Sequence, residues 1–97
     1  MSYVSETIEA LRAGLGPNDG SDEALLRLYA LLVHTTGVDT ELRHVHDAWA
    51  LWREQSRPEH PDLVEFAELS PEVADYDRPY MALIRHVAAE REHRGGW

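Results

Sequence analysis

Residues 45–79 read VHDAWALWREQSRPEHPDLVEFAELSPEVADYDRP, and this stretch decides which kind of fold the chain can form. Its first part has the apolar spacing of a helix, with Val45, Trp49 and Trp52 on one face. Residues 56–66 contain two prolines and no helical period, which favours an extended connection across the surface. Residues 70–72, Ser-Pro-Glu, combine a capping side chain, a proline and an early acid, the pattern of a helix start. The stretch therefore predicts two helical segments joined by an extended connection, and no sheet.

Further helices are predicted on the N-terminal side. The first spans residues 5–13, with Ser5 as its cap and an apolar face of Val4, Ile8, Leu11 and Leu15. The second begins at Ser21 or Asp22 and ends at Gly37, and its wide apolar stripe predicts a central position in the fold. The third begins near Asp39 or Thr40 and runs to about Glu54. Its two tryptophans, Trp49 and Trp52, are expected to anchor the core.

On the C-terminal side, a short helix is predicted from Ser70 to about Tyr76, and a last helix from Asp77 onward. The last helix should bury Tyr80, Ile84, Val87 and Ala88. Residues 92–97 are polar and rich in glycine, so a flexible tail is expected there. The prediction is a single domain over residues 1–97 with an all-α fold, in which four to five helices surround one core and an extended proline-containing connection wraps it.

Composition excludes several classes of function. The 97 residues carry 18 acidic and 9 basic side chains, a formal net charge of -9, which disfavours nucleic-acid binding because phosphate contacts would begin with repulsion. No apolar run is long enough for a membrane helix, and the N-terminal sequence lacks the pattern of a signal peptide, so a cytoplasmic location is expected. Cysteine is absent, which excludes thiol chemistry. Every basic residue is arginine, which indicates a bacterial or phage origin.

Catalytic and metal-binding patterns are weak. His44, His46, His60 and Asp62 can be assembled into a ligand set, but helical residues two apart point in different directions, so His44 and His46 should not converge. The serines sit at predicted helix caps, and no nucleophile motif or phosphate loop is present. We therefore expect no enzyme activity, no metal and no cofactor, with a metal-dependent hydrolase as a remote alternative.

The motifs VHDAW at 45–49, HPDLVEFAEL at 60–69 and YDRP at 76–79 resemble those of the RyR domain, the small repeat of ryanodine receptors and its bacterial relatives. The resemblance covers residues 45–88 and leaves residues 1–41 as two additional helices. The family has a longer segment than residues 50–59 before the His-Pro pair, and Glu65 stands where the family has proline.

The resemblance implies a non-enzymatic binding module that recognises a nucleotide-type small ligand in a bacterial conflict or signalling system. Trp49 or Tyr76 would stack on a base, and Arg53 or Arg78 would bind phosphate oxygens. The candidate ligand-binding residues are His46, Trp49, Arg53, His60, Tyr76 and Arg78.

Two alternatives stay open. In a purely structural interpretation the aromatic residues fill the core, His46 and His60 satisfy buried backbone groups, and Arg78 pairs with a carboxylate. In the other, the chain is a structural or protein-interaction subunit that uses an acidic helical surface, with Leu26, Leu31 and Trp97 as exposed apolar contacts. The oligomeric state is left undetermined.

Overall fold

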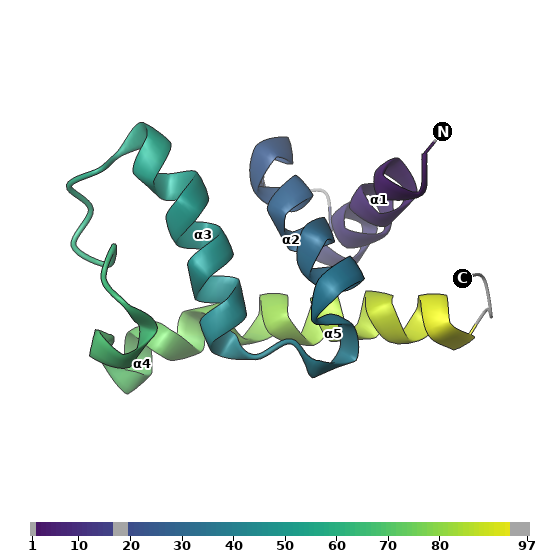
Figure 1. Ribbon diagram of the computed structural model, residues 1–97. Helices are drawn as coiled ribbons and strands as arrows, with labels where there is room; N and C mark the ends of the chain where they lie inside the picture. The colour runs from purple at the N-terminus through teal and green to yellow at the C-terminus, as the bar shows by residue number, and fades with distance from the viewer. Residues whose placement is uncertain (1, 17–19, 94–97) are drawn as a thin grey trace.

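The computed structural model describes residues 2–16 and 20–93, and these form helices joined by short connections (Figure 1). No strand occurs in the described residues, so the all-α prediction is confirmed. Four helices have 13 to 16 residues and one has four. In chain order the elements are α1 (Tyr3–Leu15), α2 (Glu23–Thr35), the 3-10 turn η1 (Gly37–Asp39), α3 (Leu42–Ser56), η2 (Phe66–Glu68), α4 (Pro71–Ala74), η3 (Asp75–Asp77) and α5 (Arg78–His93).

Side-chain caps determine where the helices begin. Ser2, not Ser5, caps α1, because its hydroxyl accepts the Ser5 N–H at 3.1 Å. Asp22 caps α2 and Ser70 caps α4, as predicted. At α3 the Nδ1 atom of His44 accepts the Glu41 N–H at 2.8 Å, so this histidine satisfies a helix terminus.

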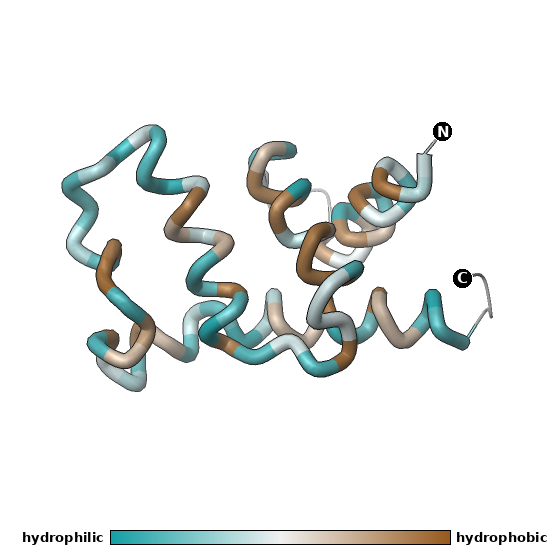
Figure 2. The backbone as a smooth tube through the Cα atoms, in the orientation of Figure 1, coloured by the Kyte–Doolittle hydropathy of each residue, from teal (hydrophilic) through white to brown (hydrophobic). Residues whose placement is uncertain are grey.

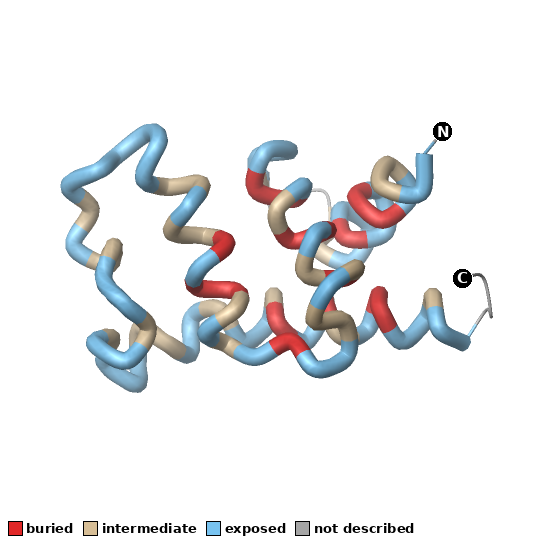
Figure 3. Tube along the Cα trace, viewed as in Figure 1, coloured by how far each residue is buried: buried red, intermediate tan, exposed pale blue. Residues whose placement is uncertain are grey.

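The core lies where α5 crosses α1, α2 and α3, and Figure 3 shows the buried positions gathered there. Helices α1 and α2 supply more than half of it, and α2 packs against all three of the other long helices, as its wide stripe predicted. Leu26 is 1% exposed, so its predicted role as a surface contact is wrong, whereas Leu31 is 57% exposed. The core residues are Ile8, Leu11, Leu25, Leu26, Tyr29, Ala30, Val33, Val45, Ala48, Met81, Ile84, Val87 and Ala88.

Residues 49–80 contribute no fully buried side chain, although they hold most of the stretch quoted first. Trp52 is half-buried and packs against the edge of the core, while Trp49 is half-buried and lies outside it. The prediction that both tryptophans anchor the core is therefore wrong for Trp49. Tyr80, predicted to be buried, is also only half-buried at the edge of the core.

The connection from Arg57 to Glu65 is folded into turns, so the predicted extended path is wrong. The His60 N–H donates to Arg57 O at 3.1 Å, and the Leu63 N–H donates to His60 O at 3.1 Å. Each proline here sits inside a turn, a position that its fixed φ also suits. Figure 2 shows this connection as mostly hydrophilic, in contrast to the apolar stretches along α2.

At the C-terminal end, Glu92 and His93 belong to α5, so the prediction of a flexible tail is wrong for these two residues. The rest of that predicted tail, including Trp97, lies outside the described residues. Among the described residues, no helix combines the length and the apolar character needed to cross a bilayer.

Candidate ligand site

Helix α3 presents three of the six candidate residues on one face. His46, Trp49 and Arg53 are three and four residues apart, a spacing that places side chains one above the other along a helix. Facing them are the 57–65 connection, η2, α4 and η3. The chain reverses direction through these short elements before α5, which brings residues 60–77 back against α3.

A hollow of about 280 Å³ lies between α3 and these elements. It gathers five of the six candidate residues, and Arg78 is the one that it leaves out. Its other lining residues were not predicted as ligand contacts. The lining consists of His46, Trp49, Arg53, His60, Asp62, Leu69, Val73, Tyr76 and Asp77.

Arg78 points to a different partner. Its Nη2 and Nε atoms donate to Asp75 Oδ1 at 2.8 and 3.2 Å, one helical turn earlier in the chain. The structural interpretation of Arg78 as a carboxylate partner is therefore confirmed.

Aromatic rings form the floor of the hollow. The Trp49 ring stacks on His46, with centroids 5.8 Å apart, and meets His60 edge to face at 5.1 Å. His46 also packs against Phe66, at 6.2 Å between centroids. Tyr76 is 71% exposed, so its ring remains available at the rim.

The two histidines have structural hydrogen bonds. His46 is 3% exposed, and its Nε2 atom lies 2.7 Å from Val64 O. Because a carbonyl only accepts, Nε2 carries the proton and donates. In His60, Nδ1 accepts the Asp62 N–H at 3.0 Å. The interpretation that both rings satisfy backbone groups is confirmed by these bonds.

Arg53 is the cationic group of the hollow. Its guanidinium carbon lies 4.4 Å from the centroid of the Trp52 ring, within the range of a cation–π contact. Its Nε atom is buried and makes no hydrogen bond to any of the described residues. A buried donor without a hydrogen-bond partner lowers the stability of the fold, so an acceptor that reached this atom would be stabilising.

Two carboxylates, those of Asp62 and Asp77, line the same hollow as this arginine. The lining therefore carries two aspartates and one arginine. Burial raises the pKa of Asp77 above its usual 3.8, and the nearby His46 partly offsets that rise. The hollow thus has no excess of positive charge.

A second hollow of about 460 Å³ shares Trp49, Arg53, Tyr76 and Asp77 with the first. Its other walls come from the start of α2 and from the aromatic residues Tyr29, Trp52 and Tyr80. The Trp52 indole N–H donates to Asp22 Oδ2 at 3.2 Å, which ties α3 to the cap of α2. No local signal in the sequence connects Asp22 or Asp77 with Trp49, because only the tertiary fold brings them together.

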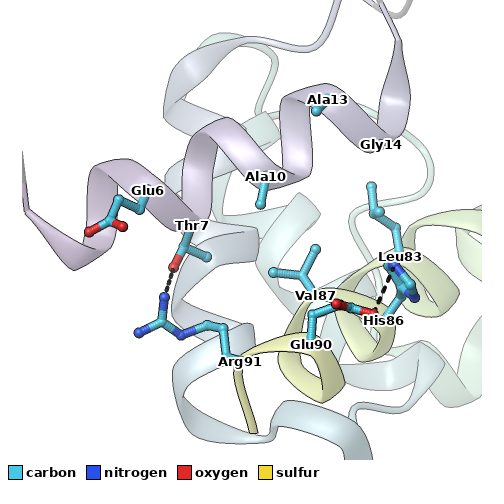
Figure 4. Close-up of a pocket in the computed structure, with 10 residues that line it drawn as sticks. All are labelled: Glu6, Thr7, Ala10, Ala13, Gly14, Leu83, His86, Val87, Glu90 and Arg91. Carbon is cyan, nitrogen blue, oxygen red and sulfur yellow. Dashed lines mark hydrogen bonds and ion pairs between the residues drawn. The ribbon is translucent and has the colours of Figure 1, made fainter. Parts of the chain in front are cut away.

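A third hollow, of about 420 Å³, lies between α1 and α5 (Figure 4). Small residues of α1 form its wall, and a Cβ added at Gly14 would overlap the Leu83 side chain. Two of its polar side chains are already engaged: Thr7 Oγ1 lies 3.5 Å from Arg91 Nη1, and also 2.8 Å from Nε2 of His34, which is not part of the lining. His86 and Glu90 form a second pair across one helical turn. This groove is therefore a weaker candidate for a ligand than the aromatic hollow.

A family model described as "Domain of unknown function (DUF7701)" matches residues 2–89. Comparison with curated proteins and with solved structures gave no match. The resemblance to the RyR domain is thus wrong, since the family that matches is a different one and includes the two N-terminal helices.

Proposed function

We propose that this chain, which belongs to the DUF7701 family, is a non-enzymatic binding module that holds a small nucleotide-type ligand by its planar base in the α3 hollow. One observation carries the proposal. Arg53, whose buried Nε atom has no hydrogen-bond partner among the described residues, lines a hollow together with the rings of Trp49 and Tyr76. A planar heterocycle suits this lining, because its faces stack on rings and its lone pairs accept hydrogen bonds from a guanidinium.

The charged side chains that line the hollow favour some nucleotide-type ligands over others. Asp62 and Asp77 would repel a chain of phosphates, and Arg53 is the only cationic side chain among the lining residues. Carboxylates accept hydrogen bonds well from the amino groups of nucleobases. A nucleoside or a monophosphate therefore fits better than a triphosphate.

The volume agrees with a ligand of this size. About 280 Å³ is just below the usual range of ligand pockets, roughly 300–1,000 Å³, as expected for a small ligand. The second hollow, which is also lined by Trp49 and Arg53, offers additional room for a sugar.

The hydrogen bonds of the two histidines favour binding without catalysis. His46 Nε2 and His60 Nδ1 are each engaged by backbone groups. The lining holds no serine, threonine or cysteine that either ring could activate. The cytoplasmic location and the bacterial or phage origin predicted from composition remain part of this proposal.

A thermal-shift screen of the full chain against nucleosides, nucleoside monophosphates, triphosphates, cyclic dinucleotides and ADP-ribose tests it. A ligand at 100 times its dissociation constant adds about 2.7 kcal/mol of stability, a readily measured shift. We expect nucleosides and monophosphates to shift the melting temperature more than triphosphates.

Arg53→Gln and Arg78→Gln form a matched pair for the same screen, because only the first arginine lines the hollow. We expect the shift to disappear in Arg53→Gln and to persist in Arg78→Gln. Silence across the panel, or equal loss in both variants, would contradict the proposal.

A further inference from the structure

The outer face of α3 carries a groove that is not part of the proposed ligand site. Asp47, Ala50, Leu51 and Glu54 recur at helical spacing on this face. Leu63, Val64 and Glu65 of the connection lie opposite, and together they enclose an open groove of about 430 Å³. The groove is separate from the aromatic hollow, although buried His46 contributes to the walls of both.

The floor of this groove is apolar and exposed. Leu51 is 57% exposed and Val64 is 37% exposed, so both present apolar surface to water. Leu63 and Ala50 are half-buried beside them. Exposed leucine in the middle of a helix contributes little to the fold, but it is suited to receive an apolar side chain of a partner.

The rim of the groove is entirely acidic. Asp47, Glu54 and Glu65 line it, and none of them forms an ion pair with any of the described residues. The groove has no arginine in its lining. Three unpaired carboxylates around an apolar floor are complementary to an apolar side chain flanked by basic ones.

We infer that this groove docks a basic, amphipathic segment of another protein, which inserts an apolar side chain beside Leu51 and places lysine or arginine side chains against Asp47, Glu54 and Glu65. This inference is independent of the nucleotide-type ligand, because it rests on a different groove.

A second copy of the chain is a poor occupant. Each copy carries a net charge of -9, so an acidic groove would face an acidic partner. Several arginines are also paired within the chain, with Arg43, Arg57 and Arg78 each bound to a neighbouring carboxylate. A basic partner gains from the charge that a second copy would have to overcome.

The test uses a fluorescent helical peptide of about fifteen residues, made of leucine on one face and lysine on the other, titrated with the full chain and followed by anisotropy. The same peptide with glutamate in place of lysine is the charge control. We expect the lysine peptide to bind, the glutamate peptide not to bind, and the affinity to fall as salt is raised from about 50 to 300 mM.

Leu51→Ser and Leu31→Ser are matched variants, because both leucines are 57% exposed on long helices and only Leu51 lines the groove. We expect Leu51→Ser to weaken binding about tenfold and Leu31→Ser to leave it unchanged. The double variant Glu54→Gln/Glu65→Gln should weaken binding about as much, whereas Glu72→Gln/Glu92→Gln, on α4 and α5, should not.

Equal weakening by the two serine variants would overturn the inference, since the peptide would then bind acidic surface without selecting the groove. Absence of binding up to about 1 mM peptide would also overturn it. Sedimentation of the chain alone completes the test: a dimer that Leu51→Ser dissociates would assign the groove to a second copy instead.

Discussion

The Asp77 carboxyl in the aromatic hollow makes the stability of the fold depend on pH. Burial raises the pKa of this carboxyl above 3.8, and nearby His46 acts on that pKa in the opposite direction. The folded chain therefore holds this proton more tightly than the unfolded chain does. The stability contributed by the protonated group is fully present below about pH 3.8 and is lost as the pH rises through the folded-state pKa.

Asp77→Asn removes this ionisation while keeping nearly the same shape. We expect the variant without ligand to be more stable than the wild type at pH 7, and we expect the difference to vanish as the pH falls below about 3.8. Urea denaturation at a series of pH values measures both. Asp47→Asn, on the exposed face of α3, is the control and should show no such trend. A gain for Asp77→Asn that does not depend on pH would refute this account.

At the scale of elements, three faces of α3 line three different regions of the molecule. Val45 and Ala48 face the core, Trp49 and Arg53 face the hollow, and Leu51 faces the outer groove. The connection that walls both the hollow and the groove is held to α3 through the bond from His46 to Val64 O. This bond from a buried side chain and the edge-to-face contact of Trp49 with His60 both hold the connection against α3.

His46→Phe keeps an aromatic ring at this position but removes the donor. We expect a loss of about 1–2 kcal/mol in the free energy of unfolding, because the carbonyl loses its partner and the connection loses one of its attachments. Hydrogen exchange should show faster exchange at the Leu63 amide, with the amides of α2 little changed relative to global stability.

His86→Phe is the matched control, since His86 lies exposed on α5 and packs against neither the hollow nor the connection. It should leave both measurements near those of the wild type. Uniform acceleration of exchange across all helices in His46→Phe would instead indicate that His46 supports the whole fold.

At the scale of the whole molecule, the core is shared between sequence-distant helices. Residues of α1 and α2 pack against Met81, Ile84 and Val87 of α5, while α3 adds Val45 and Ala48. A segment over residues 45–88 alone would lose more than half of these partners. The N-terminal helices are therefore part of the core, and we expect the fold to require them.

A fragment of residues 41–97 tests this directly. We expect it to have low helicity and no cooperative thermal transition by circular dichroism, because its apolar faces would lack partners to bury them. The full chain under the same conditions should melt cooperatively. A fragment that melts cooperatively would show that the C-terminal part folds by itself.

The sequence alone determined the fold class and the approximate helix positions. Period, proline placement and capping residues are local signals, and they located the caps at Asp22 and Ser70 and the buried face formed by Ile84, Val87 and Ala88. The same local signals could not assign the family: short motifs over residues 45–79 resembled the RyR domain, whereas the match over residues 2–89 is to another family.

Only the tertiary structure decided which apolar and charged side chains meet. Leu26 and Leu31 lie in the same helix, and the crossing of α2 with its neighbours buries the first and leaves the second exposed. Trp49 and Trp52 share a helix, yet one lines a hollow beside the core and the other packs against the core. Arg53 and Asp77 line the same hollow because the chain reverses between α3 and α5. Local propensity acts over a few residues, whereas burial depends on which distant segments the packed helices bring together.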